Sequence, residues 1–420
     1  MKQHFYALAL GLLTVALPAA AQNNASFLEK EAAAKRQCAA MDVLEAQIAA
    51  DPSRAKRMAD IEAHTRAFES TPVAQRGTGV TITIPVVVHV VYNTAAQNVS
   101  QAQIDAQIRV LNEDFAKTNA DISNLPAGFL DEAGSTNVQF VLAKRSPTGA
   151  ATTGVIRRQT KTRSFSSNDF VKYTSRGGSD AWPADKYLNL WLCNLGNGLL
   201  GYAQFPGGPA ATDGVVCLYS SVPGGTASNY NKGRTATHEV GHWLNLRHIW
   251  GDATCGNDFV ADTPTQQTSN GGCPSYPKVT CSNGPDGDMF MNYMDYTYDA
   301  CMYMFTNGQS ARMDALFTTG GARASLITSN GGIAPRTAMA AAPAYSLYPN
   351  PATDVLNLRN GAATPAELSV TVYDIHGLQL KGARYDAATG QLDVRNLPKG
   401  MYRLTIKNGD QVTQQSFIKE

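Results

Sequence analysis

Three of the seven histidines of this 420-residue chain lie within one short segment, and their spacing restricts how that segment can fold. His238 and His242 are four residues apart, so their imidazoles project from one face of a helix. His248 follows six residues later. On a continuous helix, at ~100° per residue, its side chain would point about 120° away from that of His242. The three rings can meet only if the helix ends between His242 and His248.

The residue types in this segment predict a catalytic zinc site. Two imidazoles one helical turn apart can bind the same Zn²⁺, and a third protein ligand leaves the fourth position open to water. Glu239 follows the first histidine and can take the proton of that water, whose pKa the metal lowers. Asn245 lies where the helix must end, and asparagine tolerates left-handed backbone better than other non-glycine residues. We therefore expect a turn at Asn245 that brings His248 to the metal.

Other third ligands, and a segment without metal, are the alternatives. The next glutamate after Glu239 is Glu367, in a β-rich C-terminal segment, so a glutamate ligand on a following helix is not expected. An aspartate ligand remains open, and so does a helix whose histidines are incidental.

The N-terminus has the residue order of a secretory signal peptide, which we place at residues 1–21. Lys2 precedes an apolar run at 5–17 and small residues at 19–21. The run is shorter than the ~20 residues that a transmembrane helix needs, and no later segment is long and apolar enough to span a bilayer. The formal net charge of +1 gives no reason to expect nucleic acid or an anionic membrane as partner.

Composition divides the remainder into four segments. Residues 22–75 are rich in Ala, Glu, Arg and Gln with helical patterns, and we assign them to a pro-segment. Residues 76–327 form the main domain. Residues 328–344, rich in Gly, Ala, Pro and Ser, form a linker. Residues 345–420 contain short alternating strands between turn residues, which predicts an all-β sandwich.

The main domain alternates strands with a long helix, which predicts a mixed α/β sheet. β-Branched and apolar residues at 80–92 indicate a buried strand, and Ser100 is a suitable N-cap for an amphipathic helix. Further strands are expected at 138–143 and 188–195. Residues 251–300 are rich in Gly, Asp, Asn, Pro and Cys, and loops of this length are uncommon unless they are functional or pinned.

The seven cysteines are candidates for disulfides because the protein is expected to be exported. Four lie in the irregular segment: Cys255, Cys273, Cys281 and Cys301. They can pair in three ways. Cys193 and Cys217 fall on expected strands, where they either pair or remain buried thiols. Cys38 is alone in the pro-segment, where a thiolate could occupy the fourth zinc position unless it is a spare thiol.

Two motifs give the chain a resemblance to the metzincin zinc peptidases. Residues 238–248 resemble their three-histidine signature, with Asn245 in place of the usual glycine. Residues 292–296, Asn-Tyr-Met-Asp-Tyr, resemble their methionine turn. Ile-Trp-Gly-Asp at 249–252 resembles the pappalysin branch (family M43), and the likeness spans roughly residues 76–325. It implies a twisted mixed sheet, an active-site helix and an irregular lower subdomain pinned by disulfides.

The resemblance implies roles for residues that would be uninformative alone. Met294 would form the hydrophobic base beneath the histidines, and Tyr296 would stabilise the oxyanion of the tetrahedral intermediate. Asp299 would lie at the base of the S1′ pocket and select Arg or Lys after the cleaved bond, with a surface aspartate as the alternative. Residues 188–195 would be the edge strand that pairs with an extended substrate.

It also implies a disulfide pairing, a calcium site and a latent precursor. The pairs would be Cys255–Cys281 and Cys273–Cys301. Asp258, Asp262 and Thr263 would supply oxygen ligands to calcium, with ordinary turn chemistry as the alternative. Cys38 would block the zinc until the pro-segment is removed.

The C-terminal segment resembles the sorting domains of the type IX secretion system. The resemblance rests on Leu-Tyr-Pro-Asn-Pro at 347–351 and Leu-Pro-Lys-Gly-Met-Tyr at 397–402. It implies passage through the periplasm and recognition by an outer-membrane machine. A carbohydrate- or protein-binding module is the alternative.

The sequence thus predicts a monomeric, secreted zinc endopeptidase, supported by calcium, that cuts protein or peptide substrates before Arg or Lys. A non-catalytic secreted binding protein with a structural zinc is the first alternative, and it would need a fourth protein ligand to close the site. A zinc hydrolase of other amides is the second.

Overall fold

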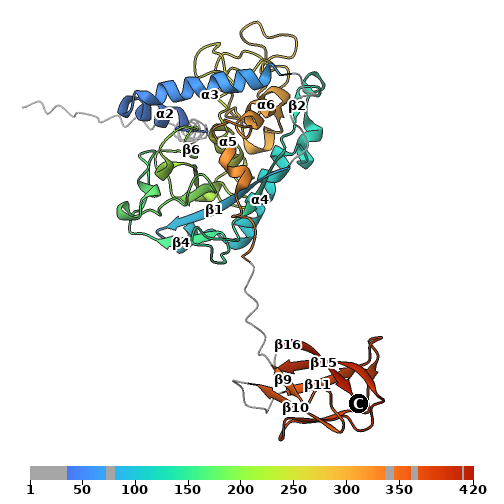
Figure 1. The fold of residues 1–420 in the computed structure, drawn as a ribbon. Helices are drawn as coiled ribbons and strands as arrows, with labels where there is room; N and C mark the ends of the chain where they lie inside the picture. Colours follow the sequence, from blue (N-terminus) through green and yellow to red (C-terminus); the bar gives the residue numbers. More distant parts are fainter. Residues whose placement is uncertain (1–35, 72–80, 336–344, 361–367, 409–410) are drawn as a thin grey trace, which may run out of the picture. The chain divides into compact units, whose positions relative to one another are not determined.

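The computed structural model describes the following stretches of the chain: residues 36–71, 81–335, 345–360, 368–408 and 411–420. They belong to two compact units, of which the first ends at Pro335 (Figure 1). No helix among these residues is long and apolar enough to cross a membrane. The predicted signal peptide at 1–21 lies outside the described residues.

The first unit is built on a six-stranded mixed sheet with strand order β3-β1-β5-β7-β6, in which β4 also pairs with β1. Its strands are β1 (Ile82–Tyr92), β3 (Val138–Leu142), β4 (Val155–Gln159), β5 (Leu188–Cys193), β6 (Gly201–Ala203) and β7 (Val215–Leu218). All pairs are parallel except that of β6 with β7. Residues 84–91 of β1 are all buried, as expected for a strand covered on both faces.

The α-helices of this unit are α2 (Ala40–Ala50), α3 (Ser53–Glu69), α4 (Gln101–Phe115), α5 (Arg234–Trp243) and α6 (Asn307–Ala315). Of these, α2, α4 and α5 pack on strands of the sheet. The Ser100 hydroxyl caps α4 by accepting the Gln103 N–H at 3.3 Å, and the Phe115 ring meets Phe140 of β3. Helix α3 lies against α6 (Figure 1) and α2 against β6, so the helices of the predicted pro-segment pack on the rest of the first unit.

One strand was assigned wrongly from the sequence. Residues 188–195 were expected to form the edge strand that holds a substrate, but β5 lies between β1 and β7, and β6 forms the edge. Every residue of β5 is buried, and a continuous apolar run of this kind is typical of an interior parallel strand. The true edge strand has three residues, too few to show a period in the sequence.

Disulfides and buried polar contacts hold the irregular segment after α5. Cys255 is bonded to Cys281 and Cys273 to Cys301, which is the pairing that the resemblance implied. Cys193 and Cys217 are buried free thiols on β5 and β7. The first unit also includes residues 329–335, because the Gly331 carbonyl accepts the N–H groups of Lys144 and Arg145.

The second unit is a β-sandwich, as the sequence predicted. One sheet has the order β13-β14-β10-β9 and the other β12-β11-β15-β16. The strands are β9 (Tyr345–Tyr348), β10 (Val355–Asn360), β11 (Leu368–Tyr373), β12 (Gln379–Leu380), β13 (Arg384–Asp386), β14 (Gln391–Asp393), β15 (Gly400–Asn408) and β16 (Gln411–Lys419). Leu356, Leu404 and Phe417 are among the buried residues of its core.

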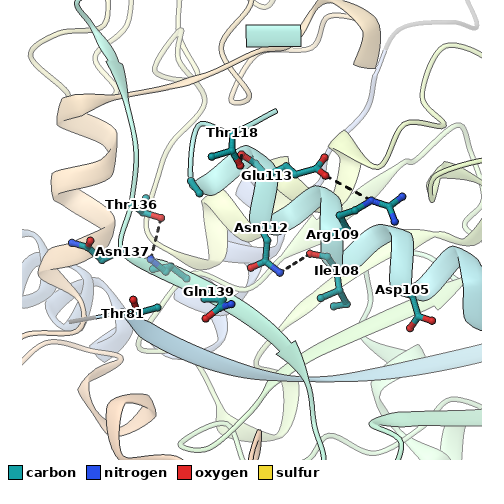
Figure 2. Close-up of a pocket in the computed structure, with 12 residues that line it drawn as sticks. Thr81, Asp105, Ile108, Arg109, Asn112, Glu113, Thr118, Thr136, Asn137 and Gln139 are labelled. Atoms are coloured by element: carbon teal, nitrogen blue, oxygen red, sulfur yellow. Dashed lines mark hydrogen bonds and ion pairs between the residues drawn. The ribbon is translucent and has the colours of Figure 1, made fainter. Parts of the chain in front are cut away.

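A cavity of about 690 Å³ lies between α4 and β3 (Figure 2). Polar side chains line it, and Arg109 and Glu113 form an ion pair at 3.7 Å on its wall. It contains none of the histidines and none of the predicted site residues, so the chemistry has to be sought elsewhere.

Candidate metal centre

The turn after α5 brings the third histidine back towards the helix. The helix ends at Trp243, and Asn245 has a φ of 69°, in the left-handed region. The Leu246 N–H then bonds back to the Gly241 carbonyl at 2.9 Å, as in helix ends closed by a left-handed residue. This is the break that the histidine spacing requires.

The three imidazoles converge through their Nε2 atoms. Nε2 of His242 lies 3.2 Å from that of His238 and 3.1 Å from that of His248. These atoms and the Cys38 sulfur all lie within 4.8 Å of one another. All three rings are buried.

The outer ring nitrogens determine which tautomers are present. Each Nδ1 faces an acceptor: His238 the Tyr293 carbonyl (2.7 Å), His242 the Leu246 carbonyl (2.8 Å) and His248 the Asp252 carboxylate (2.5 Å). Each Nδ1 must therefore carry the proton, which leaves the Nε2 lone pairs facing one another. Burial lowers the pKa of His238 and His242 well below the usual range, so neither gains a second proton. Three neutral imidazoles with converging lone pairs fit a bound metal ion.

Glu239 lies beside this cluster on α5. The Cys38 thiol donates to its Oε2 at 3.3 Å, and burial raises the pKa of Glu239 to about 8. Its carboxylate fits against β6 because Gly201 has no side chain. A Cβ on Gly201 would lie 2.6 Å from Glu239 Oε1. Any larger residue there would have to displace the carboxylate.

Tyr296 and Met294 come from the segment after the disulfide-pinned loop. The Tyr296 hydroxyl lies 3.2 Å from His248 Nε2 and contacts the backbone of Cys38. Met294 is buried against α5, where a Cβ on Gly241 would lie 2.5 Å from its sulfur. The structure therefore brings both residues to the cluster of three histidines.

Asp299 holds an arginine that the sequence reasoning overlooked. Arg36 donates to Asp299 Oδ1 at 2.6 Å, and both side chains are only 1% exposed. The guanidinium also lies over the Tyr230 ring, 5.1 Å from its centroid. Two signals were available in the sequence: Arg36 lies two residues before Cys38, and Asp299 was expected to bind Arg or Lys.

A buried carboxylate behind α5 also escaped the sequence analysis. Asp114 of α4 accepts hydrogen bonds from Arg234 (3.1 Å), Thr237 (2.7 Å) and the Tyr293 hydroxyl (2.9 Å). The Tyr293 carbonyl accepts a hydrogen bond from His238, so this network helps to hold His238, a predicted metal ligand, in its orientation. In the sequence Asp114 is one more polar residue of an amphipathic helix, which usually indicates a solvated face.

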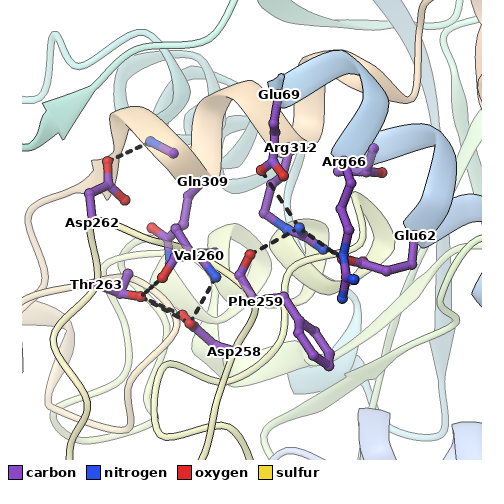
Figure 3. A network of polar contacts seen from close by, with 12 residues as sticks. Glu62, Arg66, Glu69, Asp258, Phe259, Val260, Asp262, Thr263, Gln309 and Arg312 are labelled. Carbon is purple, nitrogen blue, oxygen red and sulfur yellow. Dashed lines mark hydrogen bonds and ion pairs between the residues drawn. The ribbon is translucent and has the colours of Figure 1, made fainter. Parts of the chain in front are cut away.

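The predicted pro-segment makes a second set of buried polar contacts, through α3, away from Cys38. Arg312 of α6 pairs with Glu62 (2.6 Å) and Glu69 (3.6 Å) of α3 (Figure 3). It also donates to the Phe259 carbonyl at 3.0 Å. With its guanidinium covered by α3, Arg312 is 1% exposed.

The predicted calcium ligands are only partly brought together. The Thr263 hydroxyl donates to the Asp258 carboxylate at 2.9 Å, and burial raises the pKa of Asp258 to about 7 (Figure 3). Asp262 instead accepts from Thr306 and the Gly308 N–H at the start of α6. Asp258 is therefore a buried carboxylate without an ion-pair partner among the described residues.

Sequence comparisons connect this geometry to known proteins. Residues 172–318 match peptidase family M43, described as pregnancy-associated plasma protein-A, and residues 346–420 match the secretion system C-terminal sorting domain. An extracellular metalloprotease of Pyricularia oryzae is 36% identical over 245 residues, which cover 56% of this chain and 75% of that protein. One of Arthroderma otae is 35% identical over 240 residues, which cover 55% of this chain and 76% of that protein.

Solved structures give a closer likeness. A mutant of Tannerella forsythia promirolysin is 50% identical, with a TM-score of 0.64, and the match covers 69% of this chain and 97% of that one. Tannerella forsythia mature mirolysin in complex with a cleaved peptide is 54% identical, with a TM-score of 0.58, and the match covers 60% and 97%.

Proposed function

Because this chain belongs to the pappalysin family of metallopeptidases (family M43), we propose that it is a zinc endopeptidase that is made inactive and cuts before Arg or Lys. Its relatives are extracellular, and its sorting domain marks it for secretion. One observation carries the proposal: three Nε2 lone pairs converge beside Glu239, and the only other ligand atom of the group belongs to Cys38.

In this proposal His238, His242 and His248 hold the metal. Bound zinc supplies a Lewis acid that polarises the scissile carbonyl and acidifies water. Glu239 takes a proton from the attacking water and delivers it to the leaving amine, which its place beside the three Nε2 atoms allows. The Tyr296 hydroxyl, which burial keeps protonated by raising its pKa, donates a hydrogen bond to the oxyanion.

Removing and restoring the metal tests the function. The activated enzyme should lose peptide hydrolysis in a chelator, recover it with about one equivalent of zinc, and release peptides that begin with Arg or Lys from a peptide library. A structural-zinc binding protein would cleave nothing after its pro-segment is removed. A hydrolase of other amides would leave the library intact while still hydrolysing small amides.

The pro-segment supports the choice of Arg or Lys. Arg36 fills the position next to Asp299 that a substrate side chain would take, and the buried carboxylate needs a cationic partner there. Backbone N–H groups also hold the Asp299 carboxylate in place: its Oδ2 accepts the Lys232 N–H at 2.9 Å and the Arg234 N–H at 3.3 Å. A neutral side chain in this pocket would leave the charge unpaired.

Latency should depend on both Cys38 and Arg36. We expect the precursor carrying Cys38→Ser or Arg36→Gln to process itself about tenfold faster or more, because each change removes one anchor of the pro-segment at the centre. The time course of precursor loss, followed by mass spectrometry, measures this. Asp60→Asn breaks only the exposed Lys56–Asp60 pair of α3, keeps every Arg and Lys of the pro-segment, and should leave the time course unchanged. Equal rates in all variants would remove the latency assignment.

Calcium should stabilise the protein through Asp258. A cation bound by this buried carboxylate and the neighbouring Thr263 oxygen would offset the cost of burying the carboxylate without an ion-pair partner. Calcium is therefore expected to raise the Tm by a few degrees, which corresponds to roughly 1–2 kcal/mol in the free energy of unfolding. The same titration with Asp258→Asn should show no shift. A calcium shift that persists in that variant would place the ion elsewhere.

The second unit is assigned to export. Its match to a sorting domain supports recognition by the type IX secretion machinery, and the predicted sequence boundaries imply a linker before it. A carbohydrate-binding module would have no such match.

A further inference from the structure

The pro-segment shows which way a substrate must run. It lies parallel to β6: the Leu200 N–H bonds to the Gln37 carbonyl at 3.0 Å, and the Ala39 N–H bonds to the Gly201 carbonyl at 3.2 Å. Along this path Arg36 comes before Cys38. The Asp299 pocket therefore lies towards the residues that precede β6, and the metal lies beside β6 itself.

A substrate has to take the opposite direction. Its residue after the cleaved bond goes to Asp299, where Arg36 now lies, and its preceding residues go past the metal towards β6. The chain after the cleaved bond then continues beyond the place of Arg36, along the residues that precede β6, and the Gln37 side chain lies 3.6 Å from the Cβ position of Gly198 among them. At ~3.3 Å per extended residue, two or three further residues reach Gly196 and Asn197.

A cavity of about 350 Å³ lies at that point. Gly196 and Asn197 form one wall, at a turn closed by the Leu199 N–H and the Gly196 carbonyl at 3.1 Å. Phe165 is on another wall, and its carbonyl accepts the Gly196 N–H at 3.0 Å. Because these hydrogen bonds join the two walls, the shape of the cavity is fixed by the backbone.

The chemistry of this cavity favours a carboxylate. Arg176 is its one charged lining residue; it is exposed, and its guanidinium lies over the Phe170 ring, 4.9 Å from the centroid. No carboxylate pairs with Arg176 among the described residues, and the nearby Asp169 is bonded to Lys172 at 2.8 Å. The Asn168 amide oxygen accepts the Phe170 N–H, so its NH₂ group is left to donate.

We propose that this cavity is a subsite for the second to fourth residues after the cleaved bond, and that Arg176 pairs there with a substrate carboxylate. The carboxylate is either an Asp or Glu side chain or the free end of a short peptide. A guanidinium that lies over an aromatic ring keeps N–H groups that a carboxylate can accept. The inference rests on the proposed function, because Asp299 must bind the residue after the cleaved bond.

Quenched fluorescent peptides with Arg after the cleaved bond test the subsite. One series carries Glu, Gln or Lys at the third and fourth positions after that bond, with an amidated end, and a second series has Gln there and a free end. For the enzyme activated from the full chain, we expect kcat/KM to be roughly three- to tenfold higher for Glu than for Gln, and lower for Lys. Arg176→Gln should abolish this preference, and Arg176→Glu should reverse it.

Arg109→Gln is the matched control, since it removes one exposed arginine from the other cavity. The preference should survive in that variant, and the amidated Gln peptide should be cut at the same rate by all variants. If Arg109→Gln and Arg176→Gln lower the preference for Glu equally, the preference comes from long-range attraction between the protein's positive charge and the peptide. That result would overturn the subsite. Equal rates for Glu, Gln and Lys in the unmodified enzyme would also overturn it. If no peptide of either series is cut, the proposed function itself fails.

Discussion

Replacing Glu239 with glutamine is expected to lower kcat for peptide hydrolysis by about 10²–10⁴-fold, the usual contribution of a general base. The glutamine has the same shape, so it fits the space against Gly201 that the glutamate fills. It cannot take a proton from water. The loss should appear in kcat rather than in KM, because Glu239 is proposed to act on the water and the leaving amine and not on substrate binding.

Metal content and folding have to be measured in the same variant. Because the three imidazoles are oriented by Tyr293, Leu246 and Asp252 and not by Glu239, the zinc content should stay at about one equivalent. Glu113→Gln, on the outer face of α4, serves as the control and should keep full activity. A Glu239→Gln enzyme with normal kcat would end the proton-transfer assignment. One with no zinc would show that the glutamate acts on the metal instead.

The convergence of the three histidines could be predicted from the sequence because the argument was geometric. Two histidines four apart fix a helical face, and the third is then possible only with a break. Asn245 was the residue suited to that break, and its φ is 69°. The buried strand at 80–92 and the capped helix after Ser100 are also local features, set by composition and by a single capping residue.

Contacts between distant segments could not be predicted in the same way. Asp114 is far from Tyr293 in the chain, and no pattern within α4 shows which polar residue turns inward. The edge strand was misplaced because strand order depends on how the chain crosses the sheet, whereas burial alone can be seen in the composition. The Arg36–Asp299 pair joins two segments that are 263 residues apart, and neither segment alone shows where the other lies.

The same Arg36–Asp299 pair leads to the second large effect. Asp299→Asn should lower kcat/KM by on the order of 10²-fold or more for substrates with Arg or Lys after the cleaved bond, because a buried cation would lose its partner. The asparagine oxygen can still accept the N–H groups of Lys232 and Arg234, so the pocket should keep its shape. Substrates with a neutral residue at that position should lose little, and the selectivity should fall.

Asp299→Asn also has to weaken the precursor, and this distinguishes a specificity pocket from a merely structural aspartate. Arg36 uses the same carboxylate, so the variant precursor should be less latent towards neutral peptides, although the mature variant is slower on Arg peptides. A structural role would lower all rates together and leave the latency unchanged. Asp105→Asn, an exposed residue of α4, controls for the loss of one negative charge. If the selectivity for Arg and Lys survives in Asp299→Asn, another group must bind the Arg or Lys side chain of the substrate. Arg36 would then serve only to hold the pro-segment.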